Sequence, residues 1–203
     1  MPRLTVPTVL AAVTLLVAPG WAADAQEAAF GLRWDQSEGD LKAAGVVPSG
    51  VTPKKVLNGS VAMYDGIKLS KAFEDIEACS LLFTRQHELA KIYCASKNVE
   101  NDPYGDQMKA RYSRVKSLIS GRYGKGKSIE FQDHLWQGHD EWWMSMKTKR
   151  GSWSTFWDND TSRVMLDVEG LSGNSGFYDI SLEHKVRWKD VHSQKEKREE
   201  GQF

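Results

Sequence analysis

The sequence predicts an α+β fold, in which antiparallel β-meanders form one or more sheets with one long amphipathic helix and one short N-terminal helix. Three observations lead to this prediction. Short apolar segments separated by turn residues recur in both halves of the chain, one segment (101–121) has a clear helical period, and two cysteines flank a hairpin pattern. The 203 residues suit one domain, and we assign residues 26–184 to it.

Residues 1–25 have the pattern of a secretory signal peptide: a basic residue, an apolar run at 9–18, a Pro-Gly break and small residues. An A-x-A signature ends at Ala25, and cleavage two or three residues earlier is an alternative. The apolar run is too short to cross the ~30 Å bilayer core as a helix. No cysteine precedes Cys79, so the cleavage site carries no lipid anchor. We expect a periplasmic or secreted protein whose mature chain has no transmembrane segment.

The charges of the chain balance. Lysine and arginine together number 27, as do aspartate and glutamate, so the formal net charge is zero. Charge therefore indicates neither a nucleic acid nor an anionic membrane as a partner. We expect no cofactor and no metal, and the expected partner is another envelope or secreted protein. The sequence leaves the oligomeric state open.

In the first half, a short strand at 28–34 leads into a brief helix that ends at Gly45. Ser37 and Asp40 have the spacing of a capping box at the start of that helix. Three strands are expected to follow, at 55–65, 74–84 and 89–96.

The two cysteines are expected to form a disulfide. A polar turn at 84–88 makes the flanking segments a hairpin in which Leu81 lies opposite Ile92, Phe83 opposite Ala90, and Cys79 opposite Cys94. An oxidising compartment keeps such a bond closed, and closing this short loop contributes roughly 3 kcal/mol. A redox-active pair is less favoured, because the C-x-x-C spacing is absent.

The long helix is the clearest element. Asn101, Asp102 and Pro103 supply its cap and first turn, and Gly121 is expected to end it. Its apolar residues recur at three- and four-residue steps: Tyr104, Met108, Tyr112, Val115, Leu118 and Ile119. A strand at 128–131 is expected to follow.

The C-terminal half is predicted to be a four-stranded meander, with turns at 148–151 and 158–162 and a loop at 172–176. The turns set Trp143 opposite Trp157 and Phe156 opposite Val164. The expected core face is then Trp142, Met144, Met146, Phe156, Val164, Leu166, Val168, Tyr178, Ile180 and Leu182.

The opposite face of this meander is polar except for three tryptophans. It collects Trp143, Ser145, Lys147, Trp153, Thr155, Trp157, Arg163, Met165, Asp167 and Phe177. Arg163 is expected opposite Trp157, in position for a cation–π contact. Trp143, Trp153, Trp157 and Arg163 are therefore the candidate binding surface. In the alternative, the long helix or the N-terminal strands cover these tryptophans and make them a second core layer.

Residues 185–203 are highly charged with little apolar periodicity, which is typical of a partly disordered tail.

The chain offers only weak candidates for catalysis. It has no H-E-x-x-H pair and no G-x-S-x-G motif. His134 and His139 have acidic neighbours in an expected polar loop and could act only if they converged in one cleft. Residues 121–128 match the phosphate-loop pattern letter for letter. However, a helix precedes them and a strand follows, which reverses the order that phosphate binding requires.

Several short motifs carry a resemblance. Phe30-Gly-Leu-Arg-Trp34 precedes Ser37 and the short helix, and Leu118-Ile-Ser-Gly-Arg-Tyr-Gly124 ends the long helix before tryptophan-bearing strands. This pattern resembles a broad group of small exported bacterial proteins of unknown function, which often have glycine at the position of Asp35. It is also similar to the helix-plus-meander units of β-lactamase-inhibitor-like and outer-membrane-assembly lipoprotein domains, which bind other proteins. The resemblance assigns no site residues.

The sequence thus favours a noncatalytic exported module that binds a protein or acts as an inhibitor. A carrier of a small apolar ligand is the alternative. An enzyme that uses the loop of His134 and His139 is a third hypothesis.

Overall fold

The computed structural model describes residues 27–135 and 141–200, and side chains as far as residue 193. The fold is α+β, as predicted, with one antiparallel sheet of eight strands in the order β1-β2-β3-β4-β8-β7-β6-β5. The strands are β1 (Lys54–Val56), β2 (Val61–Ile67), β3 (Ile76–Phe83), β4 (Leu89–Ser96), β5 (Lys127–Phe131), β6 (Ser152–Asp158), β7 (Ser162–Ser172) and β8 (Ser175–His184).

Four helices lie in the described part of the chain, two more than predicted. They are α1 (Glu38–Ala43), α2 (Asp106–Tyr123), α3 (Glu141–Lys147) and α4 (Lys185–Glu200). None of them is long and apolar enough to cross a membrane. The expected signal peptide at 1–25 lies outside the described residues.

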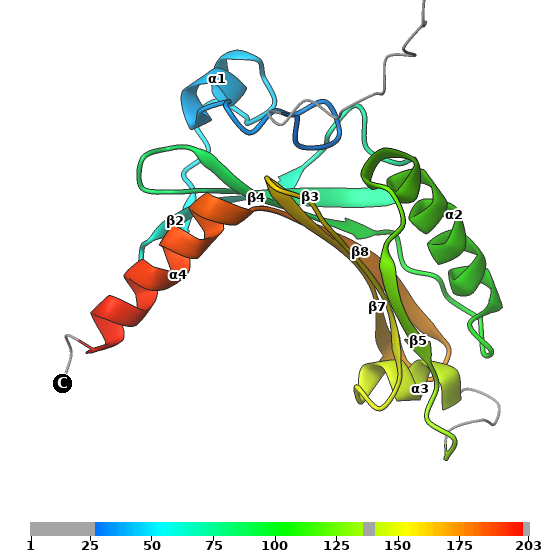
Figure 1. The fold of residues 1–203 in the computed structure, drawn as a ribbon. Helices are drawn as coiled ribbons and strands as arrows, with labels where there is room; N and C mark the ends of the chain where they lie inside the picture. The colour runs from blue at the N-terminus through cyan, green and yellow to red at the C-terminus, as the bar shows by residue number, and fades with distance from the viewer. Residues whose placement is uncertain (1–26, 136–140, 201–203) are drawn as a thin grey trace, which may run out of the picture.

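The sheet is built from two similar halves. In each half a helix precedes a four-stranded meander: α1 with β1–β4, and α2 with β5–β8, where α3 is inserted between β5 and β6. The last strands of the two meanders, β4 and β8, pair antiparallel, with Ile92 opposite Leu182 and Cys94 opposite Ile180. Figure 1 shows that this joint continues the bent sheet from one half into the other.

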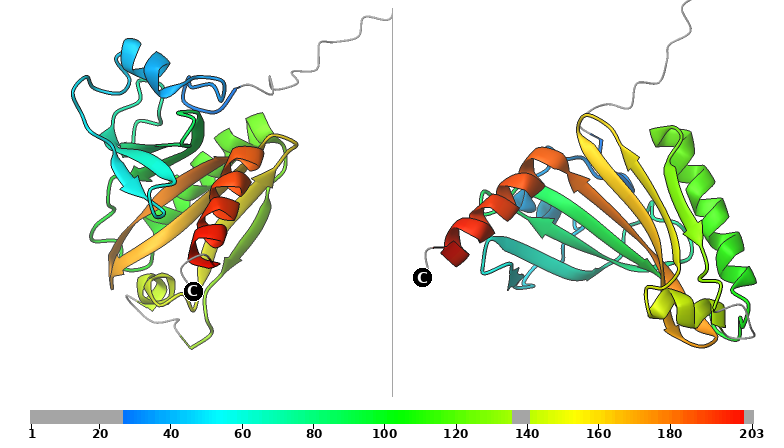
Figure 2. Two further views of the ribbon diagram at one scale, coloured as in Figure 1. Left: turned by 90° about the vertical axis from the view of Figure 1, so that its left-hand side faces the viewer. Right: turned by 60° about the horizontal axis from the view of Figure 1, so that its bottom comes forward.

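The two faces of the sheet have different cover, and Figures 1 and 2 show α2 and α4 on opposite sides of it. On the face that we call the α2 face, β-strand side chains such as Leu166 and Ile180 pack against α2 and the N-terminal segment. On the other, the α4 face, Trp188 and Val191 of α4 pack with Val61 and other residues of β1–β3. Successive residues of each strand alternate between these faces.

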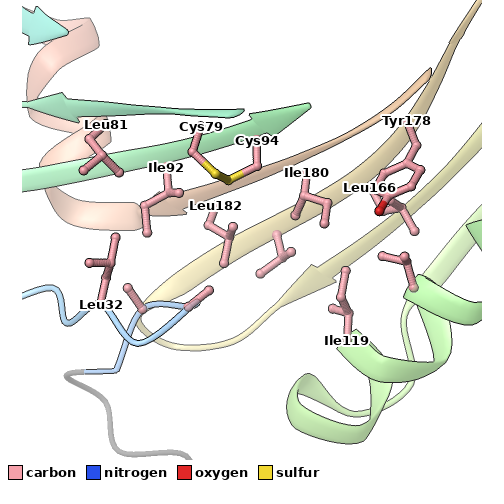
Figure 3. Close-up of a cluster of buried hydrophobic side chains, with 14 of the residues drawn as sticks. Leu32, Cys79, Leu81, Ile92, Cys94, Ile119, Leu166, Tyr178, Ile180 and Leu182 are labelled. Atoms are coloured by element: carbon pink, nitrogen blue, oxygen red, sulfur yellow. A yellow bond between two sulfur atoms is a disulfide. The ribbon is translucent and has the colours of Figure 1, made fainter. Parts of the chain in front are cut away.

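The predicted β3–β4 hairpin and its disulfide are confirmed. Cys79 pairs with Cys94 in register, and their sulfurs are bonded on the α2 face (Figure 3). Leu81 lies opposite Ile92, as expected. Phe83 pairs with Leu89 instead of Ala90, because the register shifts after Leu82. A bulge of this kind offsets the pairing by one residue near the turn.

The N-terminal elements are confirmed in part. Residues 28–34 form a tight turn, not a strand: the Ala28 amide donates to the Leu32 carbonyl at 3.0 Å. Helix α1 has the predicted capping box between Ser37 and Asp40.

Helix α2 overlaps the predicted range of 101–121 but begins and ends later in the chain. The Asp102 carboxylate accepts hydrogen bonds from the amides of Gln107 and Met108 at 3.2 and 3.1 Å, which satisfies part of the N-terminal turn. The helix ends at Gly124, which has a φ of 79°, and runs past Gly121. The N-cap of α2 is Gly105, so the cap and first turn predicted at 101–103 lie before the helix, and the terminal glycine is Gly124 and not Gly121.

The prediction of a strand at 142–147 is wrong, because these residues belong to α3. Trp142, Trp143 and Met146 are buried together, a spacing that fits a helix. Trp143 packs directly on Gly176, where a Cβ atom would lie 2.1 Å from the indole ring. This close approach requires glycine and places α3 at the tip of the β7–β8 hairpin.

The register predicted between β6 and β7 is wrong by one residue. Trp157 lies opposite Val164 and Phe156 opposite Met165. Because side chains alternate with a period of two, this slip exchanges the faces of the whole of β6. Trp157 therefore lies on the α2 face and Phe156 on the α4 face.

The segment expected to be a disordered tail forms α4. Val191 is buried, and the Arg187 guanidinium donates to the backbone carbonyls of Trp34 and Leu89, the latter at 2.9 Å. Arg187 also pairs with Glu88 at 3.2 Å. These contacts tie the start of α4 to the N-terminal half of the chain.

Candidate functional site

The four residues of the predicted binding surface do not share one open face. Trp143 and Trp157 are 0% and 2% exposed, and Trp153 is half-buried against Trp142, with ring centroids 5.5 Å apart. Helix α2 covers Trp157, whose indole nitrogen donates to the Gly124 carbonyl at 3.0 Å. The alternative of a second core layer therefore describes these tryptophans correctly.

Arg163 is separated from those tryptophans by the sheet. It is exposed on the α4 face, where its guanidinium lies 3.7 Å from the carboxylate of Asp158. The expected cation–π contact with Trp157 is wrong for the same reason as the register of β6.

The predicted catalytic loop is only partly visible. His134 is exposed, with its Nδ1 atom 3.2 Å from the Asp133 carboxylate, and His139 lies outside the described residues. Across the described ranges, no group of three or more histidine, cysteine or acidic side chains could hold a metal ion.

The α4 face of β5–β8 carries a different set of side chains. Helix α4 packs toward the β1–β3 end of this face, which leaves apolar residues partly exposed at the other end. We call them the apolar strip: Ile129, Phe131, Phe156, Met165 and Phe177.

The strip reaches the edge of the sheet. Ile129 and Phe131 of β5 are 43% and 49% exposed. Every residue of β5 is exposed, and among the strands that the structure describes β5 pairs with β6 alone. An edge strand of this kind presents unpaired backbone groups beside the apolar side chains.

A row of carboxylates lies beside the strip. Asp167 and Asp179 are opposed on adjacent strands, and Glu169 follows on the same face of β7. Ser154 donates to Asp167, and Lys149 bridges Glu169 at 2.5 Å and Asp167 at 4.0 Å. Two of the three acidic groups therefore share one basic side chain at this place.

Asp179 is the least satisfied member of the row. It is 4% exposed, and its Oδ1 atom has no hydrogen-bond partner in the described structure. Burial, followed by the charges of Asp167 and Glu169, raises the pKa of Asp179 to about 7, against the effect of a hydrogen bond with Tyr93. A buried carboxylate with this environment loses its charge near neutral pH.

A second carboxylate, on the α2 side, has the opposite environment. Glu38 accepts hydrogen bonds from Lys42 at 2.6 Å, from His87 at 2.7 Å and from Tyr64. Burial works to raise its pKa, but these hydrogen bonds outweigh burial and lower the pKa of Glu38 to about 2. This network joins α1 to β2 and to the β3–β4 turn.

The sequence contained part of the signal for the open face. Met165, Asp167 and Phe177 were expected opposite the core, and Asp179 has the same strand parity as Phe177. Phe156 was missed because the one-residue slip assigned it to the core.

No known protein family, no curated protein and no solved structure matches this chain. The function must therefore be inferred from its own residues.

Proposed function

We propose that this protein is a noncatalytic, inhibitor-type binding module of the periplasm or the extracellular space. It docks another envelope or secreted protein on the α4 face of β5–β8. The observation that carries the proposal is the apolar strip, which reaches an exposed edge strand and lies beside an incompletely paired carboxylate row. The signal-peptide pattern supports the compartment.

The strip has one apolar pair at its centre, whereas Phe177 lies opposite Glu169 and is separated from that pair by the carboxylate row. Phe156 and Met165 are cross-strand neighbours, and Ile129 lies opposite Ser154 on the same side of the sheet. Contiguous apolar side chains on one face mark binding sites more often than isolated ones do. Main-chain groups of β5 could extend the contact by pairing with a strand of the partner.

The repeated architecture also supports a binding role. Two helix-plus-meander halves form one bent sheet, and the resemblance to β-lactamase-inhibitor-like units implies a surface of this kind for binding a protein. Such a sheet offers a rigid surface, because each strand except those at the edges is hydrogen-bonded on both sides.

Site-specific photocrosslinking tests the proposal. A photoreactive amino acid is placed at Met165, and the control carries it at Ser113, an exposed residue of α2 on the other side of the sheet. In cells that secrete the protein, we expect a discrete crosslinked partner from position 165 and none from position 113. Equal crosslinking from both positions, or none from position 165, would contradict the proposal.

A charge substitution then locates the contact. Met165→Lys should weaken capture of the purified partner at least tenfold, whereas Ser113→Lys should leave it unchanged. Circular dichroism and thermal unfolding establish that both variants fold. Undiminished capture by folded Met165→Lys would overturn the assignment of this face.

A further inference from the structure

A cavity of about 190 Å³ opens on the α2 face, remote from the apolar strip. Its floor is formed by Val164, Ile180 and Leu182, which are all buried core residues. Figure 3 shows Ile180 and Leu182 pointing from β8 into the space between the N-terminal turn and Ile119 of α2. The cavity therefore reaches from the surface into the hydrophobic core.

The walls of the cavity are also apolar. Leu118 and Ile119 of α2 form one side, and Ala29, Phe30 and Phe73 form the other. The rings of Phe30 and Phe73 meet edge to face at 5.4 Å. None of the described residues that line this cavity is acidic.

The turn at Phe30 and Gly31 shapes the opening. Both residues have left-handed φ angles, 55° and 81°, and a bulky residue such as phenylalanine rarely adopts this conformation. The stem of Lys71 crosses Gly31 so closely that a Cβ atom there would lie 2.8 Å from its Cδ atom. Glycine at position 31 thus lets Lys71 lie along the rim.

The two charged groups among the lining residues are cations. They are Lys71, from the connection between β2 and β3, and Arg122, from the last turn of α2. Arg122 pairs with Glu27 at 2.8 Å, and the guanidinium has further N–H donors beyond that one contact. Lys71 has no ion-pair partner among the residues that the structure describes.

We infer that this cavity binds a free small amphipathic carboxylate, with its alkyl chain on the floor and its carboxylate at Lys71 and Arg122. The apolar interior selects the chain, and the two cations select an anionic head. The volume is below the ~300 Å³ at which pockets for drug-sized ligands begin, so the chain must be short. This inference does not depend on the proposed protein-binding face.

Titration of the isotope-labelled mature protein with octanoate, followed by NMR, tests the inference. We expect saturable shifts at Ile119, Ile180 and Leu182. Octanol, which has the same chain length without the charge, should bind at least about fivefold more weakly, equivalent to about 1 kcal/mol. Equal binding of octanol, or shifts that do not saturate or lie elsewhere, would overturn the inference.

Substitutions at the rim distinguish a specific contact with the carboxylate from nonspecific hydrophobic binding. Lys71→Met keeps the apolar stem and should weaken octanoate binding at least fivefold without changing octanol binding. Lys55→Met, an exposed lysine of β1, is the matched control and should change neither. Glu27→Gln should strengthen octanoate binding, because it releases Arg122 from its ion pair.

Whether the ligand is a free carboxylate or a membrane lipid is tested separately. Vesicles of anionic phospholipid should neither sediment the protein nor displace octanoate, because a free carboxylate is the inferred ligand. Vesicle binding without saturable octanoate binding would contradict the inference, as would an unaltered octanoate affinity in folded Lys71→Met.

Discussion

The two faces of the sheet are made by the same strands but differ in the burial and the polarity of their side chains. On the α2 face, aliphatic and aromatic side chains are buried under α2 and the N-terminal segment. On the α4 face, apolar and charged residues alternate across β5–β8, and most of the apolar ones stay partly exposed, whereas Asp179 is buried. The period of two allows one face to form the core while the other carries exposed apolar and charged side chains.

The faces also differ in how they hold a buried carboxylate. Glu38, on the α2 side, has three hydrogen-bond donors and a pKa lowered to about 2. Asp179, on the α4 face, has an unpaired oxygen and a pKa raised to about 7. The hydrogen bonds to Glu38 therefore stabilise its ionised form, whereas the surroundings of Asp179 favour its neutral form.

The largest effect should come from truncating neighbouring residues on opposite faces. Trp157→Ala should cost about 3–5 kcal/mol of unfolding free energy, because it leaves a cavity under α2. Phe156→Ala should cost about 1–2 kcal/mol, because that ring is only partly buried. Urea denaturation followed by circular dichroism measures both values. Equal losses would break the distinction between the faces.

Removing the charge of Asp179 should have a smaller, pH-dependent effect. A folded pKa raised above the unfolded value gives stability that is fully present below about pH 3.8 and is lost as the pH rises through about 7. Asp179→Asn should therefore stabilise the protein by about 2 kcal/mol at pH 8 and by much less at pH 4. Thermal unfolding across this range, with exposed Asp160→Asn as the control, measures the difference. A parallel pH dependence in Asp179→Asn and the unsubstituted protein would contradict the assignment.

The smallest effect is expected at Glu38 and has the opposite sign. A folded pKa lowered from 4.5 to about 2 gives stability that is present above pH 4.5 and is lost as the pH falls toward 2. Glu38→Gln should cost about 1 kcal/mol at pH 7 and little at pH 2. Denaturant titrations at the two pH values test this, with exposed Glu77→Gln as the reference. A loss that persists at pH 2 would show that the carboxylate charge does not stabilise this network.

Local signals in the sequence were sufficient where one strong constraint acted alone. The Cys79–Cys94 pairing followed from a short turn between two strands, and the capping box at Ser37 followed from the spacing to Asp40. The hydrogen bonds between Asp102 and the first turn of α2 are equally local. These features join residues no more than 15 positions apart, so they depend little on how distant segments pack.

The C-terminal half lacked such a constraint. Large apolar residues stand next to each other at Trp142 and Trp143, and again at Phe156 and Trp157. When two neighbouring residues are both aromatic, either one can face the core of a strand, and the pair also fits a helix. The sequence pattern therefore could not decide the register of β6 or the helical state of α3.

The α+β class, the alternation along β7 and β8, and the disulfide follow from local patterns in the sequence. Which aromatic residues are core depends on contacts between segments that are far apart in the chain. Helix α2 covers one face and satisfies the Trp157 indole, and Gly176 admits Trp143. The α4 segment became a helix in the same way, because Trp188 and Val191 dock on β-strand residues from the other half of the chain. Burial against a distant segment is a long-range property, and no local period encodes it.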